Sequence, residues 1–223
     1  MGVFIAMAFV VAVAVGSAVA LFQFLSNYQP GRRRLRRDLR KLKARLAPYV
    51  TELVPLKGQE LDLLSQHQVN RRIRKRMGLQ GTGVFTTIYH EPVLAYAFRK
   101  YLGPAGTTLV YARTADHEFV FQRRKNETEI FIDGQAVGIL RPERKLYSPD
   151  KRRLLAAVRA EGEGEFLPVV VKDREIGSLV RPVERPKINH RALQFVQAEK
   201  EEEKALLLSF AILEMVGREL EGG

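Results

Sequence analysis

The side chains of this chain that could carry out chemistry are its histidines, one glycine-rich stretch and two dense runs of arginine and lysine. The four histidines are His67, His90, His117 and His190. They are isolated, and none has a second ligand at a metal-binding spacing such as H-x-x-x-H. His90 precedes Glu91 and Pro92, and this proline excludes the helical geometry of a zinc-protease motif. The histidines therefore do not predict a metal centre.

The glycine-rich stretch also lacks the residues that a nucleotide site needs. GLQGTG, at residues 78–83, has no following Lys-Ser/Thr pair and precedes a strand-like segment instead of a helix. The chain has no cysteine, which excludes thiol nucleophiles, thiolate metal sites and disulfides. No serine-hydrolase or dinucleotide motif occurs either. We therefore expect a non-enzymatic protein with no metal and no cofactor.

The basic residues gather in two short runs that could bind phosphate groups. The chain has 223 residues and a net charge of +12; residues 32–45 contribute +8 and residues 71–76 contribute +5, so the rest carries −1. Charge confined to two short runs, with a nearly neutral remainder, favours anionic phospholipid as the partner over nucleic acid. The candidates for headgroup contact are Arg32, Arg33, Arg34, Arg36, Arg37, Arg40, Lys41 and Lys43. A possible second basic patch comprises Arg71, Arg72, Arg74, Lys75 and Arg76.

An apolar segment precedes these runs and would place them at a membrane. Residues 2–25 carry no formal charge, and as a helix they would extend about 36 Å, enough for a hydrocarbon core of about 30 Å. We therefore expect a transmembrane anchor over residues 1–28. A cleaved signal peptide is the alternative, because SAVA at residues 17–20 resembles a cleavage site, but the basic residues follow the apolar run. That flank predicts a single-pass protein of the inner membrane, with the N-terminus outside and the C-terminal domain in the cytoplasm.

Residues 29–80 are predicted to form a basic, helical juxtamembrane arm. Its leucines recur at helical spacing, at Leu35, Leu39, Leu42 and Leu46. Three interpretations stay open. The helix could lie on the inner leaflet with its leucines in the interface, form a short coiled coil interrupted by Pro48 and Pro55, or only determine topology. A second helix is expected over residues 59–77, and the glycines after it predict a domain boundary.

From Val84 the pattern changes to short segments rich in β-branched and aromatic residues, which predicts antiparallel strands. Residues 130–142, IFIDGQAVGILRP, resemble residues 169–182, VVVKDREIGSLVRP, which indicates a duplicated hairpin. Each copy has a turn containing Asp, and a later glycine, Gly138 or Gly177, suits a bulge or a close packing point. Between the copies, a segment beginning at Ser148 has the start signals of a helix.

The chain ends with ALLLSFAILEMVGREL, residues 205–220, which is apolar on almost every side. Its first twelve residues, 205–216, include only two polar side chains, Ser209 and Glu214, and rise only about 18 Å as a helix, too little to cross a bilayer. Such a helix must be buried in protein, and the preceding strands could enclose it. We therefore expect five residues to be buried inside the strands: Leu207, Leu208, Ala211, Ile212 and Met215.

Many antiparallel strands, the IFIDGQAVGIL hairpin and the terminal apolar helix together resemble the tubby C-terminal-like superfamily, which includes phospholipid scramblases and LURP-one proteins. The resemblance covers about residues 84–220 and implies a mainly β fold: a closed or nearly closed antiparallel barrel around the C-terminal helix, over residues 81–223. The predicted transmembrane helix and short basic helices precede this barrel. The acylated cysteines and acidic calcium loop of scramblases are absent from this sequence, so lipid scrambling is not inferred.

These observations predict a membrane-anchored, non-enzymatic cytoplasmic binding or scaffold module that contacts anionic lipid headgroups through its basic arm. One alternative is a scramblase-like protein that handles phospholipid. Another is an accessory subunit of a larger membrane complex, because Ala12, Gly16 and Ala20 lie four residues apart and could pack against a helix of a membrane-protein partner.

Overall fold

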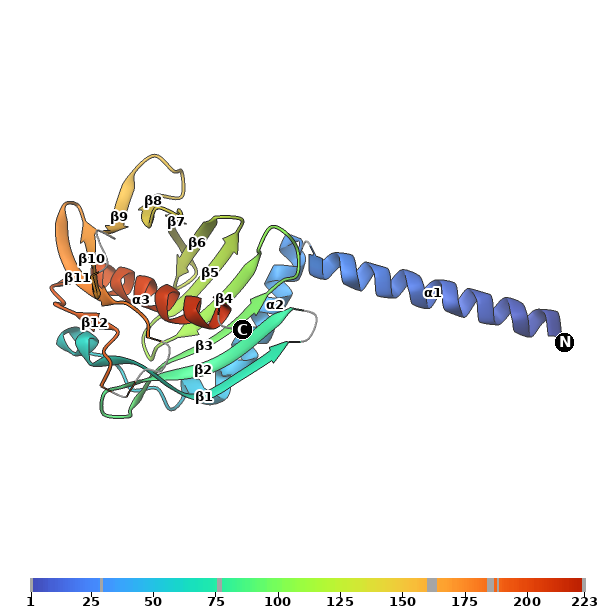
Figure 1. Ribbon diagram of the computed structural model, residues 1–223, viewed down its shortest axis with the longest axis horizontal. Coiled ribbons are helices and arrows are strands. Elements are labelled where there is room, and N and C mark those ends of the chain that lie inside the picture. Colours follow the sequence, from blue (N-terminus) through green and yellow to red (C-terminus); the bar gives the residue numbers. More distant parts are fainter. Residues whose placement is uncertain are drawn as a thin grey trace.

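A sheet of twelve antiparallel strands curls around helix α3, while helix α2 lies against the outside of the sheet and helix α1 extends away from it (Figure 1). This computed structural model describes residues 2–28, 30–75, 78–159, 164–183, 187 and 189–221. The helices are α1 (Gly2–Tyr28), α2 (Arg32–Val50), the short 3-10 helix η1 (Gly58–Leu63) and α3 (Glu201–Glu221). The first six strands are β1 (Leu64–Lys75), β2 (Leu79–Thr87), β3 (Pro92–Lys100), β4 (Thr108–Arg113), β5 (Glu118–Arg124) and β6 (Glu127–Ile132). The other six are β7 (Gln135–Leu140), β8 (Lys145–Tyr147), β9 (Leu154–Val158), β10 (Phe166–Val171), β11 (Arg174–Val180) and β12 (Leu193–Gln194).

The strands follow one another in sequence order, and their two ends meet in a nearly closed barrel. Each strand pairs antiparallel with the next, from β1 to β12. At the seam, Ser65 forms a bridge with Arg191. The Gln66 amide donates to the His190 carbonyl at 2.8 Å, and the Ala192 amide donates to the Leu64 carbonyl at 2.7 Å. The mainly β, barrel-like fold expected from the sequence is therefore confirmed.

The two similar sequences form equivalent hairpins, β6–β7 and β10–β11. In the first, Val137 is the extra residue of a bulge, because Ile130 pairs with Gly138 whereas Phe131 pairs with Ala136. In the second, Ile176 takes the same place beside Gly177. A Cβ at Gly177 would lie 2.9 Å from the Leu207 side chain, so this glycine lets the hairpin approach α3. The bulges predicted from the repeat are confirmed.

Helix α3 lies inside the barrel and completes its core. The five residues predicted to face the strands, Leu207, Leu208, Ala211, Ile212 and Met215, are all buried. They pack in one apolar cluster with inward-facing residues such as Phe85, Phe98 and Phe121. Three glutamates, Glu201, Glu202 and Glu203, occupy the first turn of α3, where negative charge complements the helix dipole.

Helix α2 covers the outer face of the same sheet. Leu35, Leu42 and Leu46 are buried in a second apolar cluster, together with Ala97 of β3 and Tyr111 of β4. The leucine spacing therefore reflects docking onto the barrel. Because the barrel already buries Leu35, Leu42 and Leu46, the apolar stripe of α2 is covered by protein of the same chain.

The helix predicted over residues 59–77 is wrong. After η1, residues 64–75 form β1, which pairs with β2 along its length. The register shifts between Val69 and Arg72, and Asn70 adopts a φ of 54°, so the strand lacks the regular alternation that would identify it. The sheet therefore begins at Leu64, before the predicted boundary at residue 81.

The helix predicted to start at Ser148 is also wrong, since residues 154–158 form strand β9. The Ser148 hydroxyl instead accepts a hydrogen bond from the Arg153 amide at 3.0 Å and caps a turn.

In the described part of the chain, no helix satisfies both the length and the apolarity that crossing a membrane requires.

Candidate functional site

The docking of α2 turns one side of this helix toward solvent, and that side is strongly basic. An amphipathic helix that buries one stripe exposes the opposite face. Six of the eight predicted headgroup contacts are exposed: Arg32, Arg33, Arg36, Arg37, Arg40 and Lys41. None of these six side chains has an ion-pair partner among the described residues. They form a free cationic surface, which we call the α2 basic face.

The other two predicted contacts, Arg34 and Lys43, point toward the barrel. Lys43 Nζ lies 2.6 Å from Glu118 Oε1 and 5.4 Å from the centre of the Tyr111 ring. The Tyr111 hydroxyl donates to Glu118 Oε2 at 3.2 Å. Burial, and then the charge of Glu118, raise the pKa of Tyr111 to about 12. Lys43 therefore fixes α2 to β4 and β5.

Arg34 belongs to a buried cluster around Asp38, whose side chain is only 3% exposed. Arg34 Nε lies 3.6 Å and Arg99 Nη1 lies 3.4 Å from Asp38 Oδ2. The Tyr101 hydroxyl donates to the same oxygen at 2.7 Å, and burial followed by this bond raises the pKa of Tyr101. A buried carboxylate requires such partners. The cluster therefore sets the position of α2 on β3.

The second basic patch divides in a similar way. Arg72, Arg74 and Lys75 are exposed on β1, and Arg76 lies outside the described residues. Arg71 is half exposed, and its Nε lies 2.6 Å from Glu219 Oε2 of α3. The bulge in β1 aims Arg71 toward this carboxylate.

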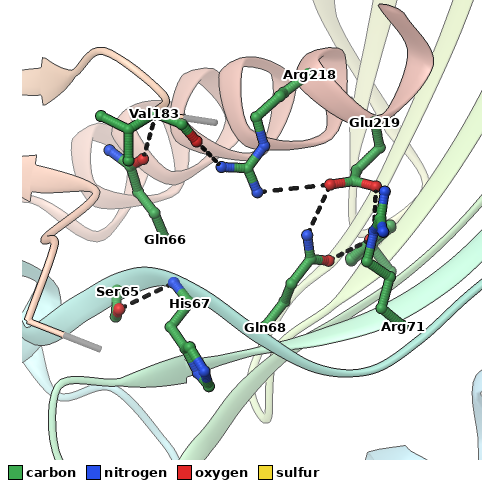
Figure 2. A network of polar contacts seen from close by, with 9 residues as sticks. Ser65, Gln66, His67, Gln68, Arg71, Val183, Arg218 and Glu219 are labelled. Carbon is green, nitrogen blue, oxygen red and sulfur yellow. Dashed lines mark hydrogen bonds and ion pairs between the residues drawn. The ribbon is translucent and has the colours of Figure 1, made fainter. Parts of the chain in front are cut away.

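Figure 2 shows the polar network that receives Arg71 at the end of α3. Glu219, 3% exposed, also accepts a bond from Gln68 Nε2 at 2.7 Å, and the Tyr96 hydroxyl donates to Gln68 Oε1 at 2.6 Å. Arg218 lies 3.5 Å from Glu219 and donates to the Val183 carbonyl. The network joins α3 to β1, so Arg71 of the possible second basic patch has a structural role in this fold.

Two basic segments distant in sequence meet in a groove between α2 and the barrel. Arg45 and Tyr49 of α2 line it together with Arg72 and Arg74 of β1. Its volume is about 180 Å³. No ion pair or side-chain hydrogen bond joins these three arginines to another described residue. We call this site the arginine groove. Arg45 was not among the predicted contacts, although it belongs to the same charged run.

The histidines contact different partners in the structure. His67 and His90 meet edge to face, with ring centres 6.1 Å apart. His117 Nδ1 lies 2.8 Å from Asp133 in the β5–β6 part of the sheet. The described residues contain no group of three His, Asp or Glu side chains that could hold a metal ion.

The predicted helix-packing face on α1 is exposed: Ala12, Gly16 and Ala20 contact no other part of the chain that the structure describes.

Compared with known proteins, the chain matches no protein-family model, no curated protein and no solved structure.

Proposed function

We propose that this protein is a membrane-anchored, non-enzymatic binding or scaffold module that contacts anionic lipid headgroups through the α2 basic face. The observation that carries the proposal is the set of six exposed cations that have no ion-pair partner within the described part of the chain; this set begins four residues after the end of α1 at Tyr28. Their backbones lie within about 15 Å along the helix axis. This arrangement suits a surface that carries many phosphates.

The anchoring part of the proposal rests on residues 2–25, which contain no charged side chain. Their larger apolar side chains are unusually exposed in this structure, including Phe4 at 82%, Phe9 at 70% and Phe22 at 73%. Neither apolar core includes a described residue before Leu35. An apolar helix without a protein surface to cover it is stabilised by lipid. The basic flank favours a cytoplasmic barrel on the inner membrane.

We further propose that the barrel is a divergent member of the tubby C-terminal-like superfamily. Support comes from the paired hairpins and from the position of α3 inside the strands. A nearly closed barrel is shared by unrelated proteins, so this part of the proposal depends on the combination of features.

The expected affinity for lipid follows from charge. A basic residue near an anionic leaflet contributes about 1 kcal/mol, and salt screens this attraction beyond about 10 Å at 0.1 M. Six cations on the α2 basic face therefore support firm binding at low salt. The three arginines of the arginine groove, Arg45, Arg72 and Arg74, supply a place for one phosphate group.

Vesicle flotation with a chain that begins at Pro30 tests the headgroup contact. Both apolar cores remain in that chain, and circular dichroism checks its fold. We expect binding to vesicles that contain phosphatidylglycerol, little binding to pure phosphatidylcholine, and loss of binding as salt rises. Replacing Arg36, Arg37 and Arg40 with glutamine should abolish flotation.

The matched control replaces three exposed basic residues outside α2 and β1, Lys145, Arg152 and Lys172, with glutamine. It removes the same charge and should float like the parent chain. Equal loss in both triple variants would mean that net charge alone acts. Equal binding to neutral and anionic vesicles at low salt would refute the headgroup contact.

A further inference from the structure

The barrel contains a cavity of about 570 Å³ that the proposed function does not use. It lies between the C-terminal part of α3 and strands β4 to β7. Val110, Phe121 and Leu140 form its wall on the strands, and Leu213 and Leu220 form its wall on α3. Ligand cavities typically measure about 300–1,000 Å³ and are mostly apolar. This cavity has the size of a binding site, and its lining is divided about equally between apolar side chains and polar or charged ones.

The rim of the cavity is strongly basic. Arg123, Arg141, Arg144 and Arg218 line it, and among its described lining residues only Glu214 carries a carboxylate. Three of these arginines are engaged: Arg144 lies 3.0 Å from Glu214, Arg141 lies 3.7 Å from Glu127, and Arg218 donates to the Val183 carbonyl. Arg123 alone has no side-chain partner among the described residues. The rim thus offers one uncommitted guanidinium and an excess of positive charge.

Strand register places Arg123 on the inner side of the sheet. Alternate residues of β5 share one face, and Phe121, two residues earlier, is buried in the barrel core. Arg123 pairs across the sheet with Thr108 of β4 and Thr128 of β6, which also line the cavity. Its charge therefore lies at the rim of the apolar wall, flanked by two hydroxyl groups.

Gly217 indicates that the space beside α3 is kept open. Glycine inside a helix costs about 0.5–1 kcal/mol relative to alanine. Here an added Cβ would meet no atom within 4 Å, and the residue lines the cavity. Packing therefore does not require this glycine, whereas any side chain at the position would occupy part of the cavity.

The cavity lies at the end of the barrel that faces α1. Its lining includes Arg123, at the end of β5, and Asn126, in the β5–β6 turn. The guanidinium of Arg124, in the same hairpin, donates at 3.5 Å to the carbonyl of Pro30, which lies between α1 and α2 in the sequence. If α1 lies in a membrane, as proposed above, the rim of the cavity is close to the lipid surface.

We infer that this cavity binds an anionic lipid with a single acyl chain, the chain against the leucines and Phe121 and the acidic group on Arg123. A fatty acid and a lysophospholipid share this chemistry. A hydrocarbon chain matches the apolar walls, and a charge-assisted bond to a guanidinium selects an anionic head. The binding step depends on the cavity alone, whereas delivery from a bilayer also rests on the proposed function.

Photo-crosslinking of the full-length chain in phosphatidylcholine nanodiscs tests this inference. The probes are palmitic acid with a diazirine on the chain, lysophosphatidic acid with the same chain, and the corresponding neutral alcohol. We expect both anionic probes to label peptides that contain Phe121 or Leu213 at least tenfold more than the alcohol does. The relative labelling by the two anionic probes identifies the preferred source of the acidic group.

Two variants separate the cavity from the surrounding bilayer. Gly217→Leu should occupy part of the cavity and reduce labelling at Phe121 and Leu213 at least tenfold, while labelling of α1 persists. Arg123→Gln should reduce anionic labelling about tenfold, and Arg124→Gln, the matched control in the same hairpin, should not. Unchanged labelling of Gly217→Leu, or equal labelling by the alcohol, would overturn the inference. Absence of label on α1 would instead count against the membrane anchor.

Discussion

Truncation of Leu46 tests whether α2 belongs to the barrel or to the membrane surface. Leu46 is fully buried in the cluster that joins α2 to the sheet. A Leu→Ala change at such a site costs about 2–5 kcal/mol, from lost apolar burial and the cavity left behind. Alanine is at least as good a helix former as leucine, so helix propensity does not contribute to the loss. We expect Leu46→Ala to lie in this range, a large part of a typical domain stability of about 5–15 kcal/mol.

Urea unfolding of the full-length chain in a nonionic detergent measures this change. The chain has seven tyrosines and no tryptophan, and Tyr101 and Tyr111 lie in the α2 cluster, so near-ultraviolet circular dichroism reports on this interface. With a slope of about 2 kcal/mol/M, the unfolding midpoint should fall by about 1–2.5 M. Arg40→Ala, on the exposed face of the same helix, is the control and should change stability by no more than about 0.5 kcal/mol.

A helix α2 docked on the barrel and a helix α2 lying in the lipid interface predict opposite results in this experiment. If the leucines faced lipid, Leu46→Ala would weaken vesicle binding and leave the unfolding midpoint of the barrel unchanged. A midpoint equal to that of Arg40→Ala would therefore refute the docking of α2.

Three further predictions concern the barrel interior and its outer face. Leu208→Asp would place an unpartnered carboxylate inside the barrel, and limited proteolysis should find no protected core; a protease-resistant barrel would contradict the position of α3. Glu219→Gln removes the charge that pairs with Arg71 and should lower the free energy of unfolding by about 1–3 kcal/mol in urea titrations, whereas no loss would show that the network is dispensable. Because burial, and then Glu118, raise the pKa of Tyr111 to about 12, the folded state holds this proton above the ordinary pKa of about 10. The stabilisation of the fold by the protonated Tyr111 hydroxyl should be complete below pH 10 and disappear as the pH rises toward 12. Tyr111→Phe should reduce this loss of unfolding free energy at alkaline pH, measured in a series of unfolding curves.

The barrel was largely predictable from the sequence because its signals are local. Strand alternation, a two-residue turn at Asp133 and Gly134, and a glycine after each bulge all act over a few residues. The burial of α3 followed from its composition, because a helix that is apolar on every side must be covered. Strand β1 was not predicted, because its irregular register at Asn70 interrupts the alternation of apolar and polar residues.

The candidate site was only partly predictable, because charge composition does not show which cations are paired. Lys43 and Arg71 belong to the same dense runs as the exposed arginines. Their partners lie 75 and 148 residues away in the sequence, at Glu118 and Glu219. No local pattern connects such pairs. The arginine groove was missed for the same reason, since it forms only where α2 meets β1.

One residue in the sequence did distinguish a docked α2 from a helix in a lipid interface. Leucines suit both positions, because acyl chains and a protein core are equally apolar. Asp38, however, lies on the leucine side of the helix, between Leu35 and Leu42. Among acyl chains its carboxylate would lack hydrogen-bond donors and would repel anionic headgroups, whereas the barrel supplies Tyr101 and Arg99. A lone acidic residue within the apolar stripe of a cationic helix therefore indicates a protein surface beneath that stripe, and the cations opposite remain free for a different partner.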